Sequence, residues 1–229
     1  MKRTAVKILI AGLALATFST VVFAGGPKVA KYAGEFIAIG VGGRALGMGG
    51  AFVALANDVT AGYWNPAGLS SINYTELSLM HEERFGSLVN YDYGAIAFPS
   101  GPRSSIGFSL IRLGVDNIDN TSEALIDAST SDRRKIYEIY NPNARVDPSR
   151  VTTFNSADWA FYFTYSKRVN EELAYGANLK LIRRSLGSNS ATGIGFDVGV
   201  RLRLMDKLAL GVNLQDITTT LLAWDTGTK

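Results

Sequence analysis

The chain has 229 residues, of which 47% are hydrophobic, with a mean hydropathy of +0.10 and no cysteine. This length suits one sizeable β domain, and the hydropathy is too low for a bundle of membrane-spanning helices. The lack of cysteine excludes disulfides, cysteine-ligated metal sites and a lipoprotein anchor.

The N-terminal residues 1–24 have the pattern of a secretory signal peptide. Three cations, Lys2, Arg3 and Lys7, precede the apolar stretch 8–16, and a small-residue cleavage site ends at Ala24. An uncleaved membrane anchor is the alternative. The three cations account for the whole formal net charge of +3, so the mature chain carries no net charge. This leaves no electrostatic basis for binding nucleic acid.

Residues 25–71 are rich in glycine and do not alternate like a strand. A short helix is expected over 51–56, where Asn57 and Asp58 would end it. The Asn65-Pro66 step predicts a stiff corner, since proline fixes its own φ and pushes the preceding residue toward an extended conformation. Gly47, Gly49 and Gly50 do not complete a nucleotide-binding fingerprint, so no cofactor is expected.

Seven later segments alternate apolar and polar residues with a period of two, which predicts strands with one apolar and one polar face. The predicted strands are 74–81, 88–98, 105–114, 157–167, 173–182, 194–204 and 208–215.

This alternation fits either a soluble sandwich or a transmembrane barrel whose apolar face meets lipid. Strands of about ten residues favour the barrel. On this interpretation Val198→Arg is costly and Gly199→Ser costs less. The lipid face is expected to hold Trp159, Phe161, Phe163, Ile194, Phe196, Val198, Leu208, Leu210 and Val212.

Connection lengths orient the predicted barrel. Short turns follow even-numbered strands, whereas longer loops at 116–155 and 185–192 follow odd-numbered ones. Bacterial barrels keep short turns in the periplasm, which places the N-terminus there and makes 116–155 a long external loop. An odd number of strands also predicts that residues 72–229 form a C-terminally incomplete barrel.

The polar phase of the later strands carries charged residues that would line the lumen of such a barrel. They would either tune what passes or form a structural network. The predicted lumen-lining residues are Asp158, Lys180, Asp197, Arg201, Arg203 and Lys207. The lone histidine, His81, is expected at the end of the first predicted strand, where its role is solvation of the adjoining loop, and no metal site is expected.

Two stretches resemble a known family. The sequences GRALGMGGAFVALAND at 43–58 and WNPAGL at 64–69 resemble the N-terminal signature of the PorV/PorQ family, within the wider FadL-like group of outer-membrane barrels. The segments 213–218 and 224–227 are also similar to that family. The quoted motif residues are Arg44, Gly47, Gly49, Gly50, Asn57, Asp58, Trp64, Asn65, Pro66, Ala67 and Gly68.

This resemblance implies an all-β, antiparallel transmembrane barrel of fourteen strands, about half of it in this chain, with residues 25–71 folded inside as a hatch. It implies a non-catalytic outer-membrane protein in type IX-like secretion, with membrane lipid, secreted cargo and secretion-machinery components as partners. The alternative that it implies is a FadL-like channel for hydrophobic small molecules. A soluble periplasmic β enzyme is a third, unrelated hypothesis.

Overall fold

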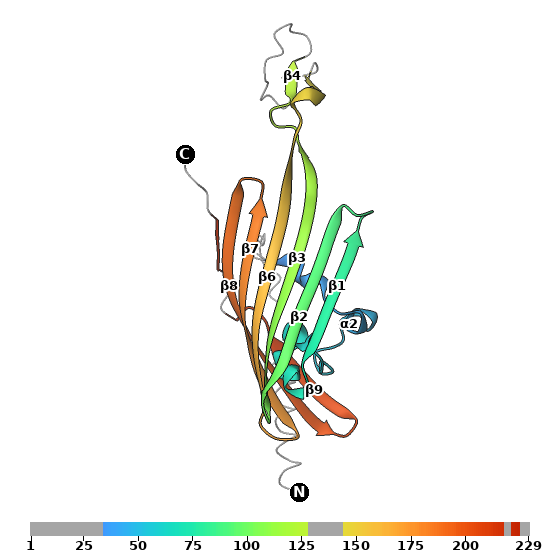
Figure 1. Cartoon of the computed structure of the whole chain (residues 1–229), viewed down its shortest axis with the longest axis vertical. Helices are drawn as coiled ribbons and strands as arrows, with labels where there is room; N and C mark the ends of the chain where they lie inside the picture. The colour runs from blue at the N-terminus through green and yellow to red at the C-terminus, as the bar shows by residue number, and fades with distance from the viewer. Residues whose placement is uncertain (1–33, 128–143, 218–220, 225–229) are drawn as a thin grey trace, which may run out of the picture.

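A computed structural model describes residues 34–127, 144–217 and 221–224, and its main feature is a curled antiparallel sheet (Figure 1). The predicted signal peptide 1–24 lies outside the described residues, as do residues 25–33 and 128–143. The described chain is mostly antiparallel β structure, with a sheet that resembles half of a barrel wall and a few short helices.

All seven predicted strands are present, and most extend beyond their predicted ends because backbone pairing continues where the apolar alternation has stopped. The last predicted strand is followed by a further one: β9 and β10 pair with successive stretches of the same strand, β8. The strands of this sheet are β1 Glu76–Arg84, β2 Val89–Gly101, β3 Ser104–Asn120, β6 Thr152–Arg168, β7 Leu173–Leu186, β8 Asn189–Met205, β9 Leu208–Leu214 and β10 Leu221–Trp224.

Two expectations about the connections are wrong. The predicted loop 185–192 is a tight hairpin, because β7 and β8 continue until only Gly187 and Ser188 join them, and Gly187 takes a φ of +56° that suits glycine. The predicted loop 116–155 begins and ends as strand. There β3 and β6 remain paired out to Asn120 and Thr152 after a register shift between Val115 and Ile118.

This paired extension projects beyond the neighbouring hairpins (Figure 1). It carries a small two-stranded sheet, β4 Leu125–Asp127 and β5 Ala144–Val146, and the 3₁₀ turn η4 Pro148–Arg150. We call residues 116–127 and 144–155 the arm.

The segment before β1 contains η2 Glu35–Ile39, α2 Gly43–Gly47, α3 Ala61–Trp64 and η3 Pro66–Ser71. The expected helix over 51–56 is absent, and these residues form turns in which Leu55 and Ala56 both donate to the carbonyl of Phe52. Gly49 and Gly50 both have positive φ immediately before it, which stops a helix from continuing out of α2. Among the described residues, no helix is long and apolar enough to cross a membrane.

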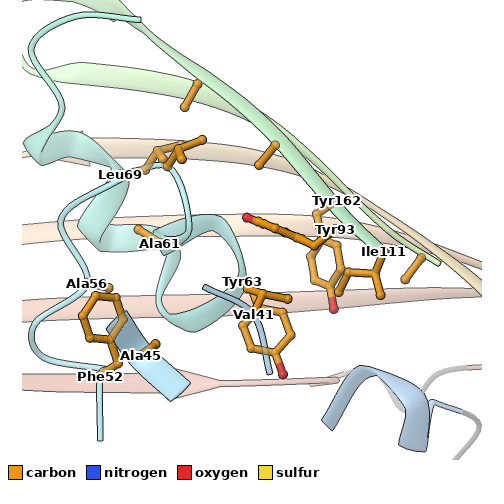
Figure 2. Packing of buried hydrophobic residues seen from close by; sticks show 14 of the residues in the cluster. Val41, Ala45, Phe52, Ala56, Ala61, Tyr63, Leu69, Tyr93, Ile111 and Tyr162 are labelled. Carbon is orange, nitrogen blue, oxygen red and sulfur yellow. The ribbon is translucent and has the colours of Figure 1, made fainter. Parts of the chain in front are cut away.

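Residues 34–71, which we call the hatch segment, pack against the concave face of the sheet. Figure 2 shows Tyr63 of this segment close to Tyr93, Ile111 and Tyr162 of the strands. The rings of Tyr63 and Tyr162 have centroids 6.3 Å apart. The hatch segment therefore shares one hydrophobic core with the sheet.

Candidate functional site

The hatch segment meets the sheet at the predicted corner, where the sequence dictates the local structure. Asn65 is extended, with φ −164° and ψ 105°, as expected before proline. Pro66 takes the first position of η3, where its missing N–H costs nothing. The Asn65 side-chain oxygen accepts a hydrogen bond from the Ala67 N–H at 3.1 Å and caps the turn. The predicted corner is confirmed.

The side chain of Asn65 also joins the hatch segment to the wall. It is completely buried, and its amide nitrogen donates to the Val53 carbonyl at 2.8 Å and to the Val200 carbonyl of β8 at 3.2 Å. One side chain therefore caps η3, ties two parts of the hatch segment together and anchors both to β8.

Other side chains of the wall donate hydrogen bonds to backbone carbonyls of the hatch segment. This pattern satisfies buried carbonyls that the short helices leave without partners. The donors and acceptors are Ser166 Oγ to Ala67 O at 3.0 Å, Asn178 Nδ2 to Gly62 O at 2.7 Å, Arg201 Nη1 to Ala56 O at 2.9 Å and Asn213 Nδ2 to Trp64 O at 3.1 Å. At the other side of the sheet, Glu76 of β1 accepts from the Val59 N–H at 2.9 Å.

Of these wall residues, only Arg201 is among the predicted lumen-lining residues. Ser166, Asn178 and Asn213 all lie on the polar phase of their strands, which is the one sequence signal that could have found them. Their short neutral side chains carry no charge pattern.

The remaining motif residues shape the hatch segment itself. Arg44 donates to the Asn57 side chain at 2.7 Å and lies 5.0 Å from the centroid of the Phe52 ring. Asp58 accepts from the Thr60 N–H at 2.9 Å, and Trp64 donates from its indole to the Val41 carbonyl at 2.9 Å. The remaining glycines of the motif differ in role: Gly47 has open space around it, Gly49 and Gly50 supply turns, and Gly68 packs against the Ala56 carbonyl.

The hydroxyl of Tyr63 holds the start of the hatch segment. It donates to the Ile37 carbonyl at 2.5 Å, and burial raises the pKa of the phenol to about 12. The phenol therefore stays protonated and remains a hydrogen-bond donor at any physiological pH.

Three of the predicted lumen residues, Asp158, Lys180 and Asp197, are buried. Lys180 of β7 lies 2.8 Å from the Asp197 carboxylate of β8 and 2.5 Å from that of Asp216. Asp197 also accepts from the Asn178 amide at 3.1 Å and from the Asp216 N–H at 2.9 Å. Asp158 is in a separate cluster and forms a bidentate pair with Arg184, which the sequence analysis missed, at 2.7 to 3.0 Å.

The structure does not bring all six predicted lumen-lining residues together. Arg201 and Arg203 lie toward the other end of β8, where Arg203 donates to the Glu171 carbonyl at 2.7 Å and is half exposed. Lys207 lies in the exposed turn between β8 and β9. Strand geometry explains this, because Asp197 and Arg203 are six residues apart along β8, which corresponds to about 20 Å at about 3.4 Å per residue.

Inward-facing glycines let the hatch segment approach the wall. A Cβ at Gly176 would lie 2.5 Å from the Pro66 carbonyl carbon, and one at Gly211 would lie 2.6 Å from Ala54 Cα. A Cβ at Gly199 would collide with the Asn65 side-chain oxygen. Gly199 therefore touches the hatch segment and does not face an open lumen, so a serine there also has a cost, and the expected difference from Val198→Arg stays a prediction.

We expect Gly176→Ala to destabilise the folded chain by about 1–3 kcal/mol, because the added methyl group meets backbone atoms of Pro66 that cannot move independently. Chemical unfolding of the chain in detergent micelles measures this. Gly94→Ala on the convex face of β2 is the matched control, where the nearest atom is an ordinary 3.5 Å away on Leu79. Equal stability of the two variants would contradict tight docking.

Comparison with known proteins identifies the family and corrects the resemblance drawn from the sequence motifs. The family model described as "Uncharacterised protein family (UPF0164)" matches residues 24–193, from the end of the predicted signal peptide into β8. This match overturns the assignment to the PorV/PorQ family and the FadL-like group, because no evidence for either accompanies it.

A curated relative, a UPF0164 protein of Treponema pallidum (strain Nichols), is 37% identical over 79 residues. The match covers 30% of this chain and only 20% of that relative. Because the family model covers well over half of the sequence, the chain belongs to the uncharacterised protein family UPF0164.

Proposed function

We propose that this chain forms wall strands of a transmembrane β-barrel in a bacterial outer membrane, and that the hatch segment closes the interior and controls the passage of small solutes. The main support for the proposal is the convex face of the sheet, where apolar residues and one glycine form rows across the strands. The proposal involves no catalysis.

Strand registers align these apolar rows across the sheet. Each row crosses six strands, and its members are on the face opposite the hatch segment. One row is Leu77, Ile96, Phe108, Phe163, Leu179 and Phe196, and the next is Leu79, Gly94, Leu110, Phe161, Leu181 and Ile194. Soluble monomers rarely expose apolar patches beyond a few hundred Å², whereas an outer-membrane barrel presents a band about 25 Å tall to lipid.

A polar row borders this band on the side of the arm. Asp92 lies 2.6 Å from the His81 ring and 3.0 Å from the Arg112 guanidinium, which in turn lies 5.6 Å from the Trp159 ring centroid. β1 continues through His81 to Arg84, beyond the predicted end of the first strand. Charged and aromatic side chains suit the boundary between lipid and water. The row is His81, Asp92, Arg112, Trp159, Arg183 and Thr192.

The concave face supports closure of the interior. The hatch segment contacts the wall from Glu76 of β1 to Asn213 of β9, and buried hydrogen bonds connect the two. A sheet in lipid must not leave a backbone edge unpaired. In the proposal the free edges of β1 and β9 therefore pair with further strands, the short turns face the periplasm and the N-terminus lies there.

A second candidate function, binding of secreted proteins or secretion components at the cell surface, is favoured by the arm. It extends past the polar row that marks the proposed membrane boundary (Figure 1). Removing the arm while keeping the hairpin closed would then change the secreted proteins of the cell and leave solute permeability unchanged. Unaltered secretion would reject this second candidate.

Opening the corner of the hatch segment tests the main proposal. We expect the full chain to fractionate with the outer membrane, and Asn65→Gly with Pro66→Gly to make reconstituted liposomes leak small sugars faster than the unaltered chain does. The changes remove the cap of η3 and the anchor to Val200 while leaving the wall strands unaltered.

The matched control is Asp147→Gly with Pro148→Gly in the arm. Asp147 caps η4 through Ser149 as Asn65 caps η3, and Pro148 is likewise the first residue of its turn. We expect this control to leave the leak rate unchanged. Recovery of the chain as a soluble periplasmic protein, or equal leakage of the two variants, would contradict the proposal.

A further inference from the structure

A small open cavity of about 80 Å³ lies where the end of η3 meets the short turn between β6 and β7. Its lining includes Ser70 and Ser71 of the hatch segment and three arginines, Arg168, Arg201 and Arg203. It is separate from the Asn65 corner and at the end of the sheet opposite the arm.

The strand registers explain why the cavity exists. Arg168 of β6, Ala174 of β7 and Arg201 of β8 lie in one row across three neighbouring strands. The small side chain of Ala174 leaves space between two long cationic ones. Arg203 is two residues further along β8, on the same face of that strand as Arg201.

Neutral carbonyl groups hold these arginines in place. Arg168 donates to the Ser70 carbonyl at 3.2 Å, Arg201 to the Ala56 carbonyl at 2.9 Å, and Arg203 to the Glu171 carbonyl at 2.7 Å. A carbonyl orients a guanidinium group without neutralising it, and each guanidinium has five N–H donors.

The nearby carboxylates neutralise this cluster only in part. Glu171 and Glu172 also line the cavity, and the Glu171 carboxylate lies 3.6 Å from Arg203. Among the ion pairs within the described residues, none involves Arg168 or Arg201. The buried Nε of Arg168 also has no hydrogen-bond partner within the same residues. A buried hydrogen-bond donor without a partner is unfavourable, and a ligand in the cavity with an acceptor atom would satisfy it.

We propose that this cavity binds an anionic group, a carboxylate or a phosphate, of a small ligand that arrives from the side of the short turns. Converging guanidinium groups suit such planar or tetrahedral oxyanions, to which they donate several hydrogen bonds at once. The volume admits one such group and leaves the rest of the ligand outside. This inference does not depend on the proposed membrane function.

Calorimetric titration of the full chain in detergent with inorganic phosphate, and separately with acetate, tests the proposal. We expect saturable binding of at least one of the two, and which one saturates identifies the class of anion. Arg168→Gln and Arg203→Gln are each expected to weaken it about tenfold or more, because each removes a charged donor.

Two further variants distinguish binding in this cavity from a general effect of charge and from misfolding. Ala174→Leu fills the space without altering a charge and is expected to abolish binding. Arg183→Gln removes a cation from the exposed convex face of β7 and is expected to leave the affinity within about twofold. Non-saturable binding of both anions, or equal weakening by Arg183→Gln, would overturn the proposal.

Discussion

Replacing Lys180 by methionine is expected to lower the free energy of unfolding by about 3–5 kcal/mol, the largest effect that we predict. The Lys180 and Asp197 side chains are only 3% and 1% exposed, so the substitution leaves a buried carboxylate without its cation. Asn178 and the Asp216 N–H still donate to Asp197, but neither carries a charge. Chemical unfolding of the chain in detergent micelles measures the loss.

Two further variants serve as controls for Lys180→Met. Lys207→Met makes the same chemical change in an exposed turn and is expected to cost no more than about 0.5 kcal/mol. Combining Lys180→Met with Asp197→Leu removes both charges and is expected to recover part of the lost stability, because the uncompensated carboxylate is gone. If Lys180→Met is as mild as Lys207→Met, the ion pair is not buried in the folded protein.

Val198→Arg is expected to cost about 2–4 kcal/mol in a lipid bilayer, because Val198 lies on the convex face of β8, two residues from Phe196 of the first apolar row. Its neighbours across the sheet are Ala177 of β7 and Leu214 of β9, which offer no partner for a guanidinium group. Unfolding from phospholipid vesicles measures the cost.

Thr192→Arg is the control for this substitution. Thr192 is on the same strand and the same exposed face, but it lies in the polar row beside Arg183. We expect a cost of about 0–1 kcal/mol there, as at a membrane interface. Equal costs at the two positions, or a cost that is the same in water, would contradict contact of this face with lipid.

The strands were predictable because a period of two is a local signal. Ile194, Phe196 and Val198 alternate with Gly195, Asp197 and Gly199, and the structure places these two sets on opposite faces of β8. The Asn65-Pro66 corner was predictable for a similar reason, since proline restricts itself and the residue before it regardless of the rest of the fold.

The contacts that make the site were not predictable in the same way, because they depend on which strands become neighbours. From the sequence, Gly199 is only a small residue on the polar face of a strand. Its close approach to Asn65 is known only once β8 is placed in the fold. From the sequence, Asn178 is an ordinary polar residue. Only the structure shows that its amide lies 2.7 Å from the Gly62 carbonyl. The short helix expected over 51–56 is absent, and these residues form turns that follow the positive φ angles of Gly49 and Gly50.

The long reach of the hatch contacts has a consequence for the order in which the chain folds. Asn213 and Trp64 are 149 residues apart in the sequence, and Arg201 and Ala56 are 145 apart. Closing such long loops costs entropy that only completed contacts repay. The hatch segment is the first part of the described chain to be synthesised. It can contact β1 and β6 as these strands form, but its docking is complete only when β8 and β9 supply Arg201 and Asn213. Completion of docking is therefore a late step that requires correctly paired strands.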